Sequence, residues 1–380
     1  MTTIAPPHSA GADHDQSLAV AHAAVEARLA ALLPSAGHER DLVVAAMRDC
    51  TLAPGKRLRP LLLLFTAQGL GACPHAALDL GCAVEMVHAA SLVLDDLPCM
   101  DNAALRRGRP TLHLAFGEDV AVLTAIALLS RAFGVVAGLQ TVGPDVRSDL
   151  VVTLTSAIGA DGLVKGQLQD LRDGARPRTA AEIAETNQLK TGALFSALLG
   201  MAGRLAGAGA SQQGTLLQLA GELGQAFQLH DDLHDRDPES GKSMGLDQGK
   251  STLLAMCGEM QVRQRLEAHL QSVEQCLNSL GLGTSPIGGV LRKVFASKGV
   301  QAAGSTVWRQ GLGGVGGGGA VMHHVNGAGR CANVYAVRVG AALVPRWAAK
   351  RPRRNELRSL NPGAAARPIA AQGPLLQGAA

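Results

Sequence analysis

Two clusters of aspartates, each at the end of an apolar stretch, are the groups in this sequence whose types and spacing suggest chemistry. The six carboxylates are Asp95, Asp96 and Asp101 in the first cluster and Asp231, Asp232 and Asp235 in the second. Carboxylates that converge in an apolar setting repel one another, and their burial is costly unless a cation accompanies them. Mg²⁺ prefers carboxylate oxygens, retains some waters and bridges to substrate phosphates. The clusters therefore predict a magnesium-dependent site for a phosphate-bearing substrate.

The spacing within each cluster sets what the backbone must do. Asp231 and Asp235 are four residues apart, so they share one face of a helix. Asp95 and Asp101 are six apart, which would place them on opposing sides of an ideal helix. Pro98 lies between them and has no N–H to donate, so a bend there is required to bring Asp101 back. One acidic run is as readily a solvated surface, whereas two runs at the ends of apolar helices favour a site.

Basic residues near the aspartates complete the pattern. They are Lys56, Arg57 and Arg59 in GKRLRP, Arg106 and Arg107 after the first cluster, Lys190 beside Thr191 in QLKTGALF, and Lys242 and Lys250 after the second cluster. Guanidinium groups and amides at the start of a helix suit a diphosphate. The sequence thus predicts a cavity with two cationic phosphate sites and two metal-binding walls. The GKST run at 249–252 lacks the glycine spacing and the preceding strand of a P-loop, which excludes an NTPase of that class.

The rest of the sequence predicts the helices that must position these residues. The chain has 380 residues, 47% hydrophobic and 2% aromatic, which favours helix over sheet. Helices are predicted at about 17–33, 40–51, 61–71, 76–97, 118–140, 145–172, 179–205, 211–235 and 250–279. The sequence contains no useful alternating strand pattern and no internal repeat. The predicted fold class is all-α, a bundle of long helices with short connections.

One apolar segment, Val120–Leu139, has the length of a membrane span. Arg131 lies inside it, and a central arginine is costly in lipid, so a buried core helix is the better interpretation. The N-terminal residues are polar and contain no signal-peptide core, and the seven cysteines are scattered without zinc-site spacing. These features predict a cytoplasmic protein with no transmembrane span.

The composition changes after about residue 290. From Gln301 onward ten Lys/Arg and one Asp/Glu give a balance of +9, which leaves −5 for the first 300 residues. Both tryptophans and the only tyrosine lie here, at Trp308, Trp347 and Tyr335. We expect a flexible N-terminus at 1–16, a folded domain at 17–290 and an atypical Gly/Arg-rich tail at 291–380. The tail is a disordered basic arm, a linker artefact or a frame-shifted reading, and the acidic body gives no support for a nucleic-acid partner.

A set of short motifs is similar, in order and approximate spacing, to the motifs of one known family. The motifs are PGKRLRP, EMVHAASLVLDD, DDLPCMD with RRGRPT, GLVKGQLQDL, KTGALF, FQLHDDLHD and GKSTL. They resemble the trans-isoprenyl diphosphate synthases, most closely the bacterial geranylgeranyl diphosphate synthases of carotenoid pathways, over about residues 17–290. The resemblance implies long antiparallel helices around a deep central cavity, and a homodimer. It also implies a prenyltransferase that joins isopentenyl diphosphate to dimethylallyl, geranyl or farnesyl diphosphate.

The resemblance also implies a role for each matching residue. The catalytic group would be Asp95, Asp96, Asp101, Asp231, Asp232 and Lys190, and Mg²⁺ would be bound by Asp95, Asp101, Asp231 and Asp235. The allylic diphosphate would be held by Arg106, Lys190, Thr191, Gln228 and Lys242, and isopentenyl diphosphate by Lys56, Arg59, His88 and Arg107. His88 lies seven residues before Asp95 on the same helix face, which favours a substrate contact over a structural histidine. Gln167 and Asp170, three residues apart, are expected to face the cavity.

The apolar stretch before Asp95 fits the implied chemistry. An allylic C–O bond ionises, the double bond of isopentenyl diphosphate attacks the carbocation, and a proton is lost. Water would quench the cation, so this stretch is expected to wall the cavity. Ala90 and Ser91, five and four residues before Asp95, are expected near the growing chain end. Small residues there accompany twenty-carbon products in this family, and a tyrosine accompanies fifteen-carbon ones, so the predicted product is geranylgeranyl diphosphate.

Three alternatives stay open on the sequence alone. A farnesyl diphosphate synthase would keep the same motifs around a shallower cavity. A regulatory, non-catalytic subunit of such an enzyme would tend to lose aspartates, and none is lost here. A terpene cyclase also uses Mg²⁺ and an aspartate motif, but it lacks GKRLRP and usually has an asparagine/serine/glutamate second motif. Pro54, Asn102 and the replaced C-terminal end depart from the family's pattern.

Overall fold

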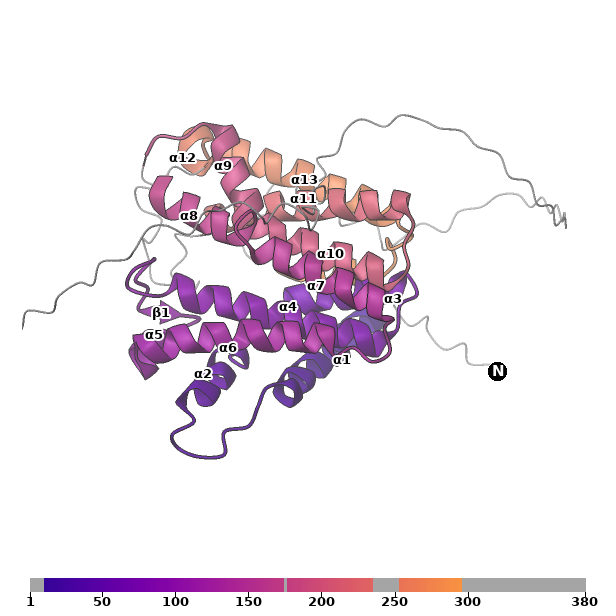
Figure 1. Ribbon diagram of the computed structural model, residues 1–380. Coiled ribbons are helices and arrows are strands. Elements are labelled where there is room, and N and C mark those ends of the chain that lie inside the picture. The colour runs from indigo at the N-terminus through magenta and orange to yellow at the C-terminus, as the bar shows by residue number, and fades with distance from the viewer. Residues whose placement is uncertain (1–9, 174–175, 235–252, 296–380) are drawn as a thin grey trace, which may run out of the picture. The chain divides into compact units, whose positions relative to one another are not determined.

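The computed structural model describes residues 10–173, 176–234 and 253–295. The chain divides into two compact units, Met1–Gly314 and Val315–Ala380, and all the described residues belong to the first. Helices dominate these residues, which confirms the predicted all-α class, and the longest of them run side by side in Figure 1. The helices are α1 (Ala10–Leu32), α2 (Leu42–Thr51), α3 (Leu58–Gly69), α4 (Pro74–Asp95), α5 (Leu112–Phe116), α6 (Glu118–Ala137), α7 (Pro144–Ile158), α8 (Leu163–Asp173), α9 (Ala180–Asn187), α10 (Ala193–Leu205), α11 (Ala210–His234), α12 (Leu253–Cys257), α13 (Glu259–Ser279) and α14 (Ile287–Phe295).

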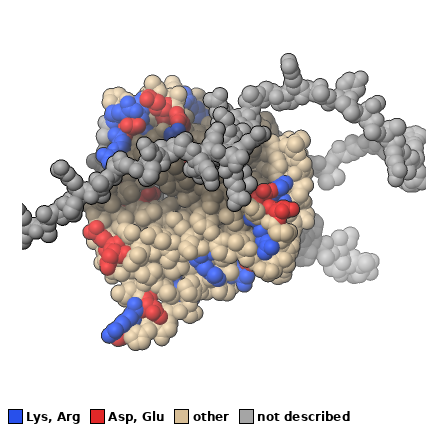
Figure 2. Space-filling model, in the orientation of Figure 1, with Lys and Arg blue, Asp and Glu red and all other residues tan. Residues whose placement is uncertain are grey.

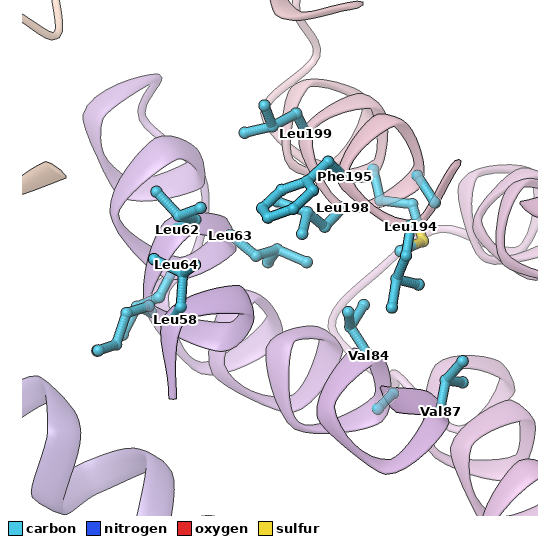
Figure 3. Packing of buried hydrophobic residues seen from close by; sticks show 14 of the residues in the cluster. Leu58, Leu62, Leu63, Leu64, Val84, Val87, Leu194, Phe195, Leu198 and Leu199 are labelled. Carbon is cyan, nitrogen blue, oxygen red and sulfur yellow. The ribbon is translucent and has the colours of Figure 1, made fainter. Parts of the chain in front are cut away.

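The hydrophobic core forms where α3, α4 and α10 meet. α4 packs against α3 and α6, α10 packs against α3, α7 and α11, and α11 lies along α13. Figure 3 shows Leu62 and Leu63 of α3, Val84 of α4 and Leu198 of α10 converging, and all four are almost fully buried. Burial of each such side chain is worth about 1.5–3 kcal/mol. This packing holds α3, α4 and α10 in register, and each of them carries residues of the candidate site.

Two glycines divide helices that the sequence predicts as continuous. The predicted helix at 145–172 is wrong as a single element, because Gly159 leaves the helical conformation and ends α7 before α8 begins. The predicted helix at 250–279 is divided into α12 and α13 at Gly258, whose φ is 81°. Apolar residues recur at helical spacing on both sides of each glycine, so hydrophobic periodicity alone does not reveal these breaks.

The predicted helix at 179–205 continues from end to end but contains one wider turn. Residues Gln188–Gly192 form a π-turn, η1, between α9 and α10. A capping box at Thr179 and Glu182 begins α9, in which each side chain bonds the backbone N–H of the other. π-turns inside α-helices are rare and occur often at functional sites. Lys190 and Thr191 lie within this one.

The backbone after α4 turns Asp101 back toward Asp95. α4 ends at Asp95, and the N–H of Asp101 donates a hydrogen bond to the Asp95 carbonyl at 2.9 Å. The predicted bend around Pro98 is therefore confirmed. A short hairpin follows, formed by β1 (Leu105–Arg106) and β2 (Arg109–Pro110), the only strands in the described residues. Its two turn residues, Arg107 and Gly108, have φ of 54° and 74°, as a type I′ turn requires.

Two helices pass a test of length and composition for membrane spans. They are α4 and α6, in which 61% and 44% of the most apolar window is buried inside the protein. Arg131 of α6, the arginine inside the apolar segment of membrane-span length, donates from Nε to the Leu32 carbonyl at the end of α1, at 2.6 Å. Both helices thus pack within the helical unit, α4 more deeply than α6.

A helix that sequence analysis did not predict, α14, extends past the expected domain boundary at 290. Leu291, Val294 and Phe295 of α14 are buried. The Phe295 ring lies 5.2 Å from the Phe227 ring and 5.4 Å from the His230 ring, both on α11. At the other end α1 begins at Ala10, within the segment expected to be flexible. The predicted tail from residue 296 onward lies outside the described residues.

Candidate active site

A cavity of about 560 Å³ brings most of the predicted site residues together. Its wall comes from α3 and the loop before it, from α4 and the hairpin, and from α8, η1, α10, α11 and α14. The predicted residues that line it are Lys56, Arg57, Arg59, His88, Ser91, Asp95, Asp101, Arg106, Arg107, Gln167, Lys190, Thr191, Gln228, Asp231 and Asp232. Asp235, Lys242 and Lys250 lie outside the described residues.

The two aspartate clusters supply two acidic parts of this wall. Asp95 and Asp101 follow from the end of α4, and Asp231 and Asp232 from the last turns of α11. Burial raises the pKa of Asp95 to about 6, the nearby Lys190 charge opposes that shift, and the Asp101 charge adds to it. The cavity therefore holds carboxylates whose ionisation is costly without further positive charge.

Asp96 faces away from this cavity, although the sequence assigns it to the catalytic group. Its carboxylate is buried and accepts hydrogen bonds from Nε and Nη2 of Arg106, the shorter at 2.5 Å. Burial raises the pKa of Asp96, and the Arg106 hydrogen bond opposes the shift. Side chains at successive helix positions point about 100° apart, which explains why two adjacent aspartates face different surroundings. Asp96 thus orients the guanidinium of Arg106, which itself reaches the cavity wall.

Arg59 and His88 form a coupled pair on the cationic side of the cavity. Arg59 Nη1 lies 3.2 Å from His88 Nε2, and its guanidinium lies 5.3 Å from the Phe195 ring centroid. Burial, followed by the charges of Arg59 and Arg107, lowers the pKa of His88 well below its usual value. A neutral His88 accepts the Arg59 hydrogen bond through Nε2. The buried Nε of Arg59 has no hydrogen-bond partner in the described residues, which suits an anionic ligand.

Lys190 is held in the π-turn by contacts that leave no room for side chains. Its Nζ donates to Asp170 of α8 at 2.8 Å. A Cβ at Gly166 of α8 would lie 2.3 Å from the Lys190 backbone nitrogen, and one at Gly224 of α11 would lie 3.0 Å from Cα of Gly192. α8 and α11 therefore touch the π-turn by backbone, which explains why glycine is needed at both positions.

Gln228 on α11 and Gln167 on α8 face the cavity as predicted, whereas Asp170 on α8 does not. Gln228 lines the cavity and donates from Nε2 to Asp232, four residues further along α11, at 2.9 Å. Gln167 also lines the cavity, and its buried Nε2 has no hydrogen-bond partner in the described residues. Asp170 instead turns to Lys190 and is not part of the cavity lining.

The two residues predicted near the growing chain lie in different environments. Ser91 lines the cavity, and its hydroxyl donates to the His88 carbonyl at 2.9 Å. Ala90 is fully buried and does not line the cavity. A side chain at position 91 therefore borders the cavity directly, whereas one at position 90 acts through the packing of α4.

Several residues that line the cavity were not predicted from the sequence. Glu85 and Phe227 lie on predicted helices, on the same face as His88 and Asp231 and about one turn before them, so helical periodicity could have indicated them. Val294 belongs to α14, beyond the predicted domain, and no sequence signal pointed to it.

The arrangement of carboxylates fits magnesium better than a metal held by protein alone. Among the described residues, no three His, Cys, Asp or Glu side chains gather closely enough to hold a metal ion. Asp95, Asp101 and Asp231 instead face one cavity that also contains cationic residues for phosphate groups. Mg²⁺ is usually held by one or two carboxylates together with substrate phosphates and water. The donor set of this cavity therefore fits Mg²⁺ bound together with a diphosphate.

Comparisons with known proteins agree with this chemistry. Residues 40–279 match the polyprenyl synthetase family. A geranylgeranyl diphosphate synthase of Pantoea ananas is 52% identical over 257 residues, covering 67% of this chain and 85% of that protein. A geranylgeranyl diphosphate synthase of Pseudescherichia vulneris is 45% identical over 287 residues, covering 75% and 92%. A farnesyl diphosphate synthase of Geobacillus stearothermophilus is 37% identical over 241 residues, covering 62% and 81%.

Solved structures agree in fold as well. The apo structure of an FPP/GFPP synthase from Zymomonas mobilis has a TM-score of 0.66 and 33% identity, and covers 75% of this chain and 98% of its own. A geranyltransferase from Helicobacter pylori, complexed with magnesium and isoprenyl diphosphate, has a TM-score of 0.68 and 26% identity, and covers 78% and 100%.

Asp95→Asn is expected to stabilise the metal-free protein at neutral pH by about 1–3 kcal/mol, since one pKa unit corresponds to about 1.4 kcal/mol. The Asp95 pKa is about 6 in the folded chain against an ordinary 3.8, so its contribution to stability is lost as the pH rises between these values. Urea unfolding in EDTA measures the difference in unfolding free energy between the variant and the parent, which should vanish at about pH 4. Asp79→Asn, on the same helix, is the control and should give no such gain. A variant less stable than the parent at neutral pH would contradict the prediction.

Gly166→Ala is expected to slow turnover by about tenfold or more, because the added Cβ displaces the backbone of Lys190 and small misplacements are costly in catalysis. Gly221→Ala on α11, where a Cβ meets nothing within 4 Å, is the matched control and should leave turnover unchanged. Steady-state rates of the two purified variants are compared at matched fold stability. Full activity of Gly166→Ala would show that the close contact does not position Lys190.

Proposed function

Since the chain belongs to the polyprenyl synthetase family, we propose that it condenses isopentenyl diphosphate with an allylic diphosphate and makes mainly geranylgeranyl diphosphate. The observation that carries the proposal is the single cavity in which two aspartate clusters meet the cations of four chain segments. A cavity lined by charged residues together with apolar side chains such as Leu92, Leu194 and Phe227 suits a substrate with a diphosphate head and a hydrocarbon tail. The enzyme is thus a transferase of isoprenoid biosynthesis, and we propose that its product supplies a carotenoid or related pathway.

The proposed chemistry assigns roles to residues that line the cavity. Bound Mg²⁺ would neutralise the diphosphate and assist its departure from the allylic carbon. Asp95, Asp101 and Asp231 would hold this ion together with the substrate, and Asp235 is proposed as a further ligand. Lys190 and Arg106 would stabilise the charge that develops on the leaving diphosphate. Asp170 and Asp96 keep these two cations oriented, through ion pairs of 2.8 Å and 2.5 Å.

The second substrate is proposed to bind on the opposite, cationic side. Arg59 and Arg107 would contact the diphosphate of isopentenyl diphosphate, and the exposed Lys56 would reach it from the loop before α3. His88 is neutral, so it accepts the hydrogen bond that keeps Arg59 in place and adds no positive charge of its own to the cavity. Leu92, Leu194 and Phe227 border the cavity as apolar side chains, which supports exclusion of water from the carbocation.

Two observations bear on product length and on the alternatives. Ser91 is small and borders the cavity, which supports a chain longer than fifteen carbons. The farnesyl diphosphate synthase relative at 37% identity keeps the fifteen-carbon product as the second candidate. Every aspartate in the first cluster is present, and so are all three in the second, which favours an active enzyme over a regulatory subunit.

We also propose a cytoplasmic homodimer that forms through α6 and α7. Val122, Leu123 and Ile126 of α6 are 38%, 52% and 58% exposed, and Val152 of α7 is 52% exposed. Figure 2 shows few charged side chains on the face that these two helices present. An apolar face of this kind on a soluble protein is typical of an interface. It also explains why α6 has the composition of a membrane span, although α6 packs within the helical unit.

The product assay tests the proposed function. The full chain, and a chain that ends after Phe295, are incubated with Mg²⁺, isopentenyl diphosphate and a five-, ten- or fifteen-carbon allylic diphosphate. Mass spectrometry is expected to find a twenty-carbon diphosphate, and EDTA should abolish it. Ending the chain at 290 instead would remove the buried Leu291, Val294 and Phe295.

Asp95→Asn and Asp79→Asn serve as a matched pair in this assay, because both lie on α4 and only Asp95 lines the cavity. The first is expected to lose nearly all activity and the second to keep it. A fifteen-carbon product would leave the transfer reaction intact and contradict the assigned length. No product from either chain, with both folded, would contradict the enzyme and favour the regulatory subunit.

Ile126→Glu is expected to convert the dimer to a monomer, because it places a charge in the centre of the apolar face of α6. Light scattering after size-exclusion chromatography measures the molar mass. Leu217→Glu on α11 is the control, since Leu217 is similarly exposed at 53% and lies on a different helix. A dimer that survives Ile126→Glu and is lost with Leu217→Glu would place the interface elsewhere.

A further inference from the structure

The loop before α3 and the first turn of α3 bring three basic residues to the cavity wall, and the middle one is the most deeply buried. Lys56, Arg57 and Arg59 line the cavity, and Lys56 is exposed. Arg57 has only 1% of its side chain exposed, and its backbone is left-handed, with φ 47° and ψ 35°. A left-handed conformation is strained for a residue other than glycine and persists only where the surroundings impose it. The contacts of the Arg57 side chain therefore impose this backbone conformation.

Four hydrogen bonds fix the Arg57 guanidinium between three parts of the chain. Nε and Nη2 donate to the two carboxylate oxygens of Glu26 on α1, at 2.6 Å and 3.2 Å. Nη1 donates to Glu85 on α4 at 3.1 Å, and Nη2 also donates to the Ala53 carbonyl at 2.7 Å. We call Arg57, Glu26 and Glu85 the anchor cluster. It joins α1, α4 and the loop through one rigid, planar group.

Two further contacts hold the same loop from its other end. The His22 ring of α1 lies 3.1 Å from the Gly55 carbonyl through Nε2. Arg107, which lines the cavity, donates from Nη1 to the Pro54 carbonyl at 3.2 Å. A Cβ at Gly55 would lie 2.6 Å from that Nη1 atom. The loop position and the Arg107 position thus depend on each other.

Glu85 creates an electrostatic problem that Arg57 resolves. Glu85 is 4% exposed, yet it belongs to the wall of a cavity suited to an anionic diphosphate. Its charge acts on both Arg59 and Arg107: burial lowers the pKa of each arginine, and Glu85 opposes the shift. With Arg57 bound to it, Glu85 is neutralised, and Arg59 and Arg107 keep their charge for a ligand. Without Arg57, Glu85 would compete with the ligand for those two guanidiniums.

We propose that the anchor cluster is a positioning device for one of the two diphosphate sites, and that Arg57 sets affinity there without touching substrate. The proposal rests on the proposed function, in which Lys56, Arg59 and Arg107 hold isopentenyl diphosphate. The allylic site uses Lys190 and Arg106, which are held by Asp170 and Asp96 and share no hydrogen bond with the anchor cluster. The cluster therefore distinguishes between the two substrates of one reaction.

The test compares KM for the two substrates in four variants of the full chain. Arg57→Gln is expected to raise KM for isopentenyl diphosphate tenfold or more and to change KM for the allylic diphosphate less than twofold. Adding Glu85→Gln to Arg57→Gln is expected to restore KM for isopentenyl diphosphate to within threefold of the parent, because the competing carboxylate is gone. Arg57→Lys, which keeps the charge and loses the fork of hydrogen bonds, should fall between the parent and Arg57→Gln.

Arg28→Gln is the matched control, because Arg28 also joins α1 to α4, through a bidentate pair with Asp79, away from the cavity. It should leave both KM values unchanged. If Arg57→Gln does not fold, Arg57→Lys and the double variant decide the matter by the same two KM values. A double variant worse than Arg57→Gln, or equal rises in both KM values, would overturn the proposal. An inactive parent enzyme would instead refute the proposed function, so the two failures are distinguishable.

Discussion

The repulsion between carboxylates that share one cavity is the constraint on which the rest of the structure depends. Asp95 and Asp101 are brought together by a backbone hydrogen bond, and Asp231 faces the same space from α11. Nothing in a helical bundle favours such an arrangement, since buried carboxylates of like charge raise the free energy of the folded state. Packing of the long apolar helices offsets that cost, and under the proposed function their side chains would exclude water from the carbocation. Under the proposed function, a bound cation would relieve this repulsion, and the basic residues of the same wall would bind the diphosphate.

Three of the basic residues around this cavity are held by acidic partners. Lys190 has Asp170, Arg106 has Asp96, and Arg57 has Glu26 and Glu85. This pattern keeps long side chains in fixed directions before any substrate arrives, and fixed charges stabilise a transition state without reorganisation. The three non-glycine residues with positive φ in the described part of the chain are Arg57, Asn102 and Arg107. Each belongs to a segment that borders the cavity, in keeping with the concentration of backbone strain at functional sites.

Much of the site was predictable from the sequence because its residues can be recognised from their type and from their neighbours along the chain. The type and spacing of carboxylates at helix ends and of basic residues at helix starts were enough to indicate a site. Nearly all of the predicted site residues that the structure describes line the one cavity. The direction of Asp96 was not predictable, because it depends on the position of its partner Arg106, which is set by the loop and the hairpin that follow α4. Glu85 was not predicted, and Arg57 was predicted only as a cation for a diphosphate, because their pairing arises from contacts among α1, α4 and the loop. Helix α14 was missed because the composition of the chain changes nearby and masks its short apolar pattern.

The π-turn at Gln188–Gly192 has a consequence for how this protein can change over evolutionary time. A π-turn contains one residue more than the α-helical turn that it replaces, so loss of a single codon would convert the whole stretch from α9 to α10 into a regular helix. Such a deletion would rotate every later side chain of the helix by about 100° relative to those before it. Lys190 and the core residues of α10 could then no longer face their present neighbours together. A substitution in this helix changes one contact, whereas an insertion or deletion changes the direction of every side chain that follows it.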